Sequence, residues 1–600
     1  MEVERGQRKM NARRHVALVA LMACASLVAS GATDAEIRLE KPAMRWLWGG
    51  FGFHNSEATM TPMMTEEFRD QRVLKSFREI SPTFSRLFAG YADWTKEAMD
   101  RFADYYDATF RRAGTTLYLV PGRMPTITED FDADAYAEDV AIRLAYLIKE
   151  RKCTKIRYYT ASNELSVGPT GAWFKKHWDM YIVVMEALYR AFRRHGLDVG
   201  LMSSDASSYA SLDTLDWSIR DLNEVTDTYC WHIYSHSRPQ GKRGRLAPGD
   251  PEFYNDLYEA LTNYVRRCIA KDKRLSLGEW GVSAKKDWNG WQRMRNDGGV
   301  GFNHPGEVAN VAAMTRVEMG LCAMNAGCVN AASWTFCDYP DPFVREDGDT
   351  VEEKGRYDVA RFSGFGVDVR YNKWGLFRWD DEAHDYSSYP DLYSMGYLVK
   401  LFRKGARVLQ ASSNDATLRI GAVTNPDGSC SMAVINWGEK KRARITSEHP
   451  IGKPLRRYVY ESANPPFNAF NDLQPVSGTV TAAKDVVAVE LPEKSITFLT
   501  TDYQDRTPPR VNGVHLEKNG VLAWTATEDA DHVYYRVYRD GKQIASTVAT
   551  SLDLGVENGQ AARSTSRTAG SAVPLGAEAM NCVPLSYSVK SVDRWGNVGE

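Results

Sequence analysis

The chain has 600 residues, with 75 Lys and Arg against 77 Asp and Glu, and this net charge of −2 excludes nucleic-acid binding through a broad basic face. Hydrophobic residues at 43% and charged residues at 25% are typical of a globular protein and exclude a disordered chain or a multi-span membrane protein. The 16 Trp and 30 Tyr suit a large core or a surface that stacks on flat ligands.

The N-terminus has the pattern of an export signal. A basic segment ending at Arg14 precedes an apolar stretch, 16–27, that is too short to cross a bilayer, and small residues follow at 30–32. We therefore expect residues 1–32 to be a signal peptide and the protein to be secreted or periplasmic. In an alternative interpretation a lipobox ends at Cys24, which then anchors a cell-surface lipoprotein. No later segment is apolar over the length that a membrane helix needs.

Strand-like and helix-like patterns then alternate. Eight short apolar runs are typical of strands, and long amphipathic patterns separate most of them. Eight such units predict an α/β fold, a (β/α)8 TIM barrel over residues 40–402, whose active site lies at the C-terminal ends of the strands. The expected strands are 44–53, 83–89, 115–120, 155–160, 198–203, 226–233, 274–280 and 329–336; expected helices include 95–112, 133–151, 173–194, 251–270 and 307–325.

The pattern changes after a helix expected at 390–402. Short alternating strands predict a β-sandwich domain over 403–503, and paired prolines before residue 510 indicate a linker. The last stretch, 508–600, resembles a fibronectin type III module. The resemblance rests on Trp524 on an early strand, a Tyr-rich strand that ends in an Asp-Gly turn at Asp540, and a Tyr-x-Val strand near the end.

The nine cysteines show no zinc-ligand spacing, and the eleven histidines are scattered. Buried free thiols are the expected state, and export leaves one or two disulfides open. We expect no metal and no cofactor.

Two glutamates follow strands that face each other across the predicted barrel. Glu164, preceded by Asn163, comes after the fourth strand, and Glu279 ends the seventh. Glycoside hydrolysis needs two carboxyl groups that flank the scissile bond. A second Asn-Glu pair, at Asn223, lies in a polar stretch and does not follow an apolar strand. The sequence therefore predicts a catalytic pair, Glu164 and Glu279.

These positions resemble clan A of the retaining glycoside hydrolases, with an outline similar to families 39, 5 and 30, over roughly residues 44–500. The resemblance implies that Glu164 is the acid/base and Glu279 the nucleophile. It also implies substrate-binding roles for Asn163 beside the acid/base, Arg86 near the end of the second strand, the His-x-Tyr pair His232 and Tyr234 on the sixth, and Trp334 on the eighth.

The expected substrate is a β-linked polysaccharide or oligosaccharide. Trp48 and Trp288 are among several aromatic residues at the expected top face, where they would stack on sugar rings, although core packing is an equal explanation for them. A basic loop, 242–245, would suit a sulfated or uronic polymer, although a solvated loop is the favoured explanation. The alternative function is a non-catalytic glycan-binding barrel at the cell surface, because fold does not determine function.

Overall fold

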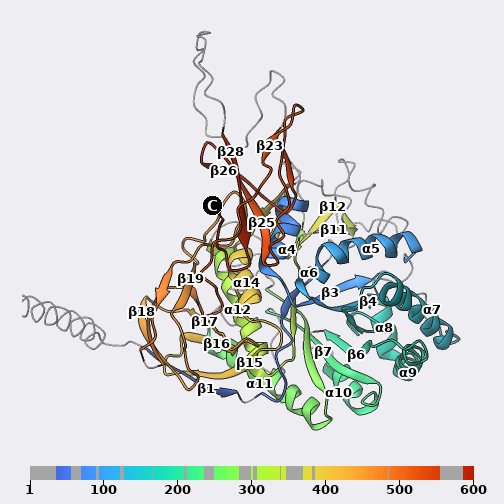
Figure 1. The fold of residues 1–600 in the computed structure, drawn as a ribbon. Helices are drawn as coiled ribbons and strands as arrows, with labels where there is room; N and C mark the ends of the chain where they lie inside the picture. Colours follow the sequence, from blue (N-terminus) through green and yellow to red (C-terminus); the bar gives the residue numbers. More distant parts are fainter. Residues whose placement is uncertain are drawn as a thin grey trace, which may run out of the picture.

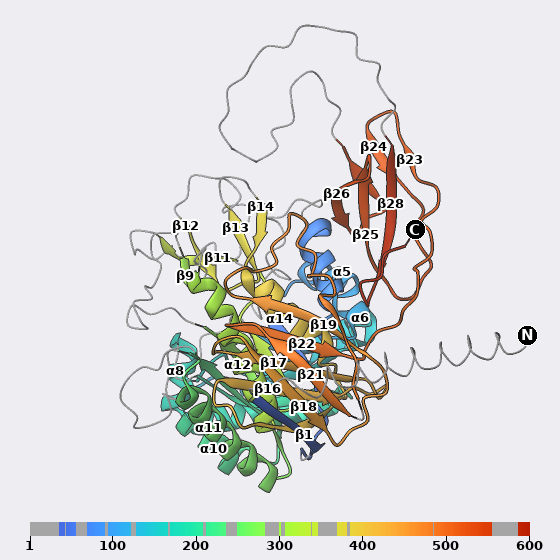
Figure 2. The same ribbon diagram turned by 90° about the vertical axis from the view of Figure 1, so that its left-hand side faces the viewer.

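The computed structural model describes most of the chain (Figures 1 and 2). It describes residues 35–42, 44–55, 69–89, 94–121, 128–165, 168–207, 212–235, 249–282, 299–301, 307–337, 339–345, 369–380, 385–483, 485–554 and 586–599. The proposed signal peptide lies outside these ranges. No helix among the described residues is long and apolar enough to cross a membrane.

Eight parallel strands close into a barrel, which confirms the predicted architecture. The barrel closes where β10 pairs with both β2 and β8. Because both faces of the barrel sheet are covered, the sequences of its strands are nearly continuous runs of apolar residues. The strands are β2 (Phe51–His54), β3 (Phe84–Ala89), β4 (Thr116–Pro121), β5 (Ile156–Tyr159), β6 (Gly200–Ser207), β7 (Thr226–Tyr234), β8 (Arg274–Gly281) and β10 (Ala331–Ser333).

Helices surround the barrel and begin where the sequence offers caps. Thr95, Asp132 and Asp250 each accept a hydrogen bond from a backbone N–H in the first turn of the helix that follows. The helical elements are η2 (Arg69–Val73), α4 (Leu74–Ile80), α5 (Lys96–Ala108), α6 (Phe110–Ala113), α7 (Ala133–Ala145), η3 (Tyr146–Glu150), α8 (Gly168–Lys176), α9 (Trp178–Arg194), α10 (Leu212–Asp221), α11 (Pro251–Ala270), α12 (Glu307–Ala326) and α14 (Pro390–Leu401).

The sandwich is one nine-stranded sheet, and it includes a strand from before the barrel. β1 (Ala35–Pro42) pairs antiparallel with β15 and parallel with β18. Apolar residues from both ends of the strand order share one core, so the sheet folds over on itself. The other strands are β15 (Arg407–Ser413), β16 (Leu418–Thr424), β17 (Cys430–Asn436), β18 (Lys441–Ser447), β19 (Leu455–Glu461), β20 (Gly478–Val480), β21 (Val486–Leu491) and β22 (Ser495–Thr500).

The described part of the terminal module forms two three-stranded sheets with Trp524 in the core between them. Asp540 and Gly541 both have positive φ, as a type I′ turn requires, and join β25 to β26. The strands are β23 (His515–Leu516), β24 (Val521–Ala523), β27 (Ser551–Asp553), β25 (His532–Arg539), β26 (Lys542–Thr547) and β28 (Tyr587–Asp593). Smaller sheets join β9 (Gly299–Gly301), β11 (Tyr339–Arg345) and β12 (Val369–Lys373), and β13 (Phe377–Asp380) and β14 (Asp385–Ser388).

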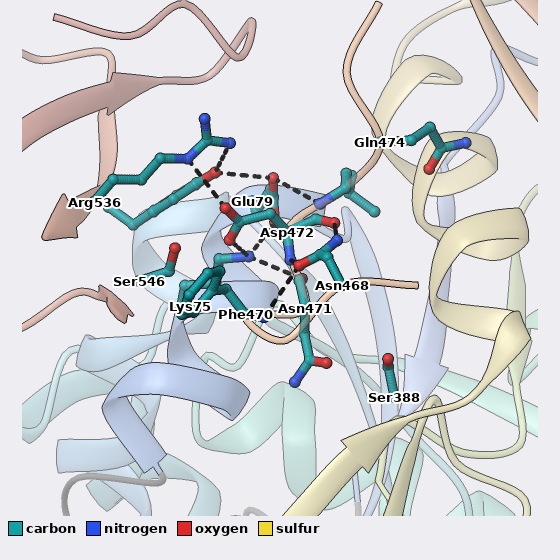
Figure 3. A network of polar contacts seen from close by, with 12 residues as sticks. Lys75, Glu79, Ser388, Asn468, Phe470, Asn471, Asp472, Gln474, Arg536 and Ser546 are labelled. Carbon is teal, nitrogen blue, oxygen red and sulfur yellow. Dashed lines mark hydrogen bonds and ion pairs between the residues drawn. The ribbon is translucent and has the colours of Figure 1, made fainter. Parts of the chain in front are cut away.

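A buried polar network joins the three parts of the molecule (Figure 3). Lys75 of α4 lies 2.7 Å from a carboxylate oxygen of Glu79 and 2.7 Å from one of Asp472, which belongs to the sandwich. Arg536 of the terminal module approaches the other oxygen of Asp472 at 3.0 Å. Lys75 is fully buried. The network therefore fixes the terminal module and the sandwich against the barrel.

The seven cysteines within the described residues are buried free thiols. They are Cys153, Cys230, Cys268, Cys322, Cys328, Cys337 and Cys430.

Candidate active site

Glu164 and Glu279 meet at the C-terminal end of the barrel strands. Glu164 lies five residues beyond the end of β5, and Glu279 lies within β8. Three atoms lie within 4.8 Å of one another: one carboxylate oxygen of Glu164, one of Glu279, and a ring nitrogen of His232. The Glu279 side chain is 4% exposed, whereas the Glu164 side chain is 15% exposed. The structure thus brings the two sequence-predicted carboxylates together, one deeper than the other.

Glu279 is held by three donors. Arg86 Nη1 donates to Oε1 at 2.5 Å, Tyr234 Oη donates to Oε2 at 2.6 Å, and His232 Nδ1 lies 3.5 Å from Oε2. Burial raises the pKa of the Glu279 carboxyl, while the charges of His232 and Arg86 and the bond from Tyr234 act in the opposite sense. The ionised form of Glu279 therefore depends on these partners.

Glu164 has a left-handed backbone, with φ of 43°. Such a conformation is uncommon for a residue other than glycine and concentrates at functional sites. The side chain receives a hydrogen bond from His232 Nδ1 to Oε1 at 2.9 Å. Helix α8 packs against this turn so closely that a Cβ on Gly171 would lie 2.3 Å from the Glu164 carbonyl oxygen. Backbone and helix together set the direction of the Glu164 side chain.

His232 bridges two carboxylates. Its Nδ1 bonds Glu164, and its Nε2 lies 2.8 Å from Asp205 Oδ1. Burial alone would lower the pKa of His232, but the charges of Asp205 and Glu279 outweigh it and hold this pKa well above its usual value. His232 is therefore an imidazolium at neutral pH, with a proton on each nitrogen.

Arg86 lies at the centre of the hydrogen-bond network and is fully buried. Besides Glu279, its Nη1 reaches His54 Nδ1 at 3.2 Å, and its Nη2 donates to Asn163 Oδ1 at 2.6 Å and to Asp205 Oδ2 at 2.7 Å. Since the Asn163 oxygen is the acceptor, its amide nitrogen keeps two hydrogens for a ligand. The structure thus places Arg86 and Asn163 beside both glutamates.

Asp205 is a site residue that the sequence analysis missed. It lies on an irregular stretch of β6 with φ of 37°, is fully buried, and accepts from Arg86, His232 and, at 2.9 Å, Tyr118 Oη. Burial would raise the pKa of the Asp205 carboxyl, but the charges of Arg86 and His232 hold it far below the usual range. The sequence did contain a signal for Asp205, because this carboxylate comes just after the strand expected at 198–203, as Glu164 comes just after the strand expected at 155–160.

His54, at the end of β2, is a second missed residue. Burial and the positive charges of Arg86 and His232 hold the pKa of His54 well below its usual value, so its ring is neutral. Since Nδ1 accepts from Arg86, the proton is on Nε2, and that atom is buried with no hydrogen-bond partner among the described residues. The Trp334 ring lies against His54, with centroids 4.2 Å apart, which places Trp334 at the site.

The structure does not place Trp48 at the site. The first barrel strand begins at Phe51 rather than at residue 44, so Trp48 precedes the strand and lies at the opposite end of the barrel. There it is 1% exposed, and its ring contacts Phe51 edge-on at 4.6 Å. Trp48 is thus a core residue, and the expected stacking role is wrong. Trp288 and the basic loop 242–245 lie outside the described residues.

Among the described residues, two groups of side chains have the proximity of metal ligands, and both include His232. One contains Glu164 and Glu279; the other contains Asp205 and Cys230. Both ring nitrogens of His232 face carboxylate oxygens of Glu164 and Asp205, and burial raises the pKa of the Cys230 thiol to about 12.

No family model and no curated protein matches this chain. Solved structures of similar fold do match. A bacterial orthologue of human α-L-iduronidase aligns with a TM-score of 0.53 and 14% identity over 95% of this chain and 99% of its own. The family 51 α-L-arabinofuranosidase AbfB from Bifidobacterium longum aligns with a TM-score of 0.53 and 14% identity. The alignment covers 78% of this chain and 100% of AbfB.

A family 30 subfamily 8 xylanase, Xyn30A from Clostridium acetobutylicum, gives a TM-score of 0.50 and 11% identity over 78% of this chain and 99% of its own. At these identities the likeness concerns the fold. The iduronidase comparison leaves 5% of the chain uncovered, so it extends into the terminal module. The chain therefore has a closed TIM barrel with a β-rich C-terminal region, an architecture that it shares with glycoside hydrolases.

Proposed function

We propose that this protein is a retaining glycoside hydrolase that cleaves a β-linked polysaccharide or oligosaccharide. The observation that carries the proposal is the pair Glu164 and Glu279, whose nearest oxygens lie within 4.8 Å at the mouth of the barrel. Retaining glycosidases hold their two carboxyl groups ~5–5.5 Å apart, whereas inverting enzymes leave ~6.5–9.5 Å for a water molecule. The similar fold of known glycoside hydrolases supports the same conclusion.

Glu279 is the nucleophile in this proposal. It is the deeper carboxylate and receives hydrogen bonds from Arg86 and Tyr234, which favour its charged form. In the first step, a Glu279 oxygen bonds to the anomeric carbon while the glycosidic C–O bond breaks. The leaving oxygen takes a proton from Glu164, which gives a covalent glycosyl-enzyme and a free alcohol.

The proton for the leaving group is shared between Glu164 and His232. His232 carries a proton on each nitrogen, and its Nδ1–H points at Glu164 Oε1. Asp205 balances the imidazolium charge from the other side of the ring. In the second step, water attacks the anomeric carbon, its proton returns to Glu164, and the bond to Glu279 breaks.

Hydrogen-bond donors that have no partner among the described residues would suit the hydroxyl groups of a sugar. The Asn163 amide would donate to the 2-hydroxyl, a bond that strengthens in the oxocarbenium-like transition state. His54 Nε2 would donate to a second hydroxyl, and the Trp334 ring beside it offers an apolar face to the pyranose ring. We further propose that the protein is exported, as the N-terminal pattern indicates.

Digestion of a glycan panel by the purified protein tests the proposal. The panel spans β-glucans, xylans, arabinans and galactans, together with uronic and sulfated polymers. Glu279→Ala serves as the matched control, since it removes the proposed nucleophile alone. Products that form with the wild type and not with Glu279→Ala support a glycosidase, and their lengths separate endo from exo cleavage. Binding to a polymer with no product from any of them would instead favour a glycan-binding barrel.

A further inference from the structure

A second candidate site lies away from the glutamates, where the barrel, α14, the sandwich and the terminal module meet. It is a cavity of about 520 Å³. Its barrel wall includes Thr83, which precedes β3, and Ala113, which precedes β4. Because the catalytic residues follow the strands, this cavity lies at the opposite end of the barrel from Glu164 and Glu279.

Among the described residues that line the cavity, positive groups outnumber negative ones. Its three carboxylates are already engaged: Glu79 with Lys75, Asp502 with Arg403, and Asp531 with Arg506 and Arg594. Figure 3 shows the first of these pairs. The five cationic side chains of the lining are Arg78, Arg112, Lys400, Arg403 and Arg594.

Three of these cations have no direct partner among the described residues, although the charge of Asp70 acts on Arg78 and the charges of Glu79, Asp593 and Asp502 act on Lys400. Within the part of the chain that the structure describes, the side chains of Arg78, Arg112 and Lys400 make no ion pair or hydrogen bond, and Arg78 Nε is buried without a partner. Burial, and then the charge of Arg112, lower the pKa of Arg78 to about 10, and burial lowers the pKa of Lys400. Arg78 and Lys400 are half-buried and Arg112 is exposed, and a partly desolvated cation gains from an anionic partner.

We propose that this cavity binds a tetrahedral oxyanion, a sulfate or phosphate group, held by Arg78 and Lys400 with Arg112 at the rim. Guanidinium donors match the geometry of such a group, and an ammonium adds a point charge. The volume leaves room for a sugar attached to the anion, so the group could be an inorganic ion or a sulfated or phosphorylated sugar. The proposal is independent of the glycosidase assignment.

An occupied cavity would strengthen the contact between the domains. Its walls include Tyr458 from the sandwich and Trp595 from the terminal module, so an anion that binds there stabilises the assembled protein. Lys400→Met removes a half-buried charge that has no direct ion-pair partner among the described residues. We therefore expect this variant to melt at the same temperature as the wild type, or higher, when no oxyanion is present, and to lose the response to the anion.

The test is thermal unfolding and calorimetric titration of the whole protein with sodium sulfate, against sodium chloride at equal ionic strength. The wild type should show a saturable rise in Tm at millimolar sulfate, and Lys400→Met should not. Lys404→Gln is the matched control, since Lys404 lines a different cavity and donates to Thr116; it should respond like the wild type. General stabilisation by sulfate exclusion does not saturate and is equal in all variants.

A wild-type response to sulfate no larger than its response to chloride, or an unchanged saturable response in Lys400→Met, would overturn the proposal. If Lys400→Met does not fold, Arg112→Gln replaces it, because that side chain is exposed; it should weaken sulfate binding several-fold. Titration with a sulfated monosaccharide identifies the source of the group. Tighter binding than sulfate indicates a sugar, and equal or weaker binding indicates the free ion.

Discussion

At the scale of single residues, Asp205 organises the candidate site without lying where a sugar would bind. It is fully buried, and its two oxygens accept from Arg86, His232 and Tyr118. Two cations and two carboxylates thus balance: Arg86 and His232 against Asp205 and Glu279. Such a buried network is costly when one member is missing, since the remaining charges lose their partners.

Asp205→Asn should therefore act through His232. Loss of the negative charge lowers the pKa of His232, so the basic limb of the kcat/KM profile should move to lower pH. The rate at the optimum should fall by about two orders of magnitude, the usual contribution of a positioned acid or base. The measurement is a pH–rate profile, with thermal unfolding as a check on folding. A lower rate with an unmoved basic limb would contradict this role.

Tyr234→Phe should move the acid limb instead. The phenol donates to Glu279 and favours its ionised form, so its loss raises the pKa of that carboxyl. We expect the acid limb of kcat/KM to shift to higher pH, with a roughly 10- to 100-fold lower kcat from the lost positioning. An unchanged acid limb, measured on the same substrate, would show that Tyr234 does not tune the nucleophile.

The sequence could predict those site residues that lie on or just after an expected strand, or that belong to a recognisable motif. Glu164, Glu279, Arg86, His232 and Tyr234 all converge. The errors come from strand ends, which periodicity locates to within a few residues. The first strand begins seven residues later than expected, which moves Trp48 to the other end of the barrel and brings His54 to the site. Likewise β6 runs to Ser207 rather than 203, and its irregular stretch turns Asp205 inward.

At the scale of elements, the contact between α8 and the turn after β5 sets the acid/base. Gly171→Ala would place a Cβ against the Glu164 carbonyl, so the turn must shift. We expect kcat/KM to fall by about 10- to 100-fold, since small misplacements of catalytic groups have effects of that size. Gly452→Ala is the control, because a Cβ there has no atom within 4 Å. Equal activity in both variants would show that α8 does not position Glu164.

Strand order within the barrel could be predicted because each strand after the first follows a helix and must pair in parallel with a neighbour. The position of β1 within the sandwich sheet could not be predicted. Its alternating pattern fits any half-buried strand, and its partners, β15 and β18, lie about 370 residues or more further along the chain. Pairings at that separation depend on how the domains pack, which local patterns do not encode.

At the scale of the whole molecule, the network around Lys75 couples the domains. Lys75→Met leaves Glu79 and Asp472 buried without their shared cation, so the free energy of unfolding should fall by about 3–5 kcal/mol. Lys96→Met is the matched control: Lys96 forms the same i,i+4 pair, with Asp100, but is exposed, and its loss should change little. Urea unfolding measures both. Equal midpoints in the two variants would contradict the coupling.

The most direct test of the central claim is chemical rescue of Glu279→Ala. On a substrate with a good leaving group, the variant should be inactive, and sodium azide should restore turnover by attacking the anomeric carbon from the vacated side. The product should be a glycosyl azide of inverted configuration, whereas the wild type should release a sugar of retained configuration. An active Glu279→Ala variant, or a wild-type product that is inverted when first formed, would contradict the assignment of Glu279 as nucleophile.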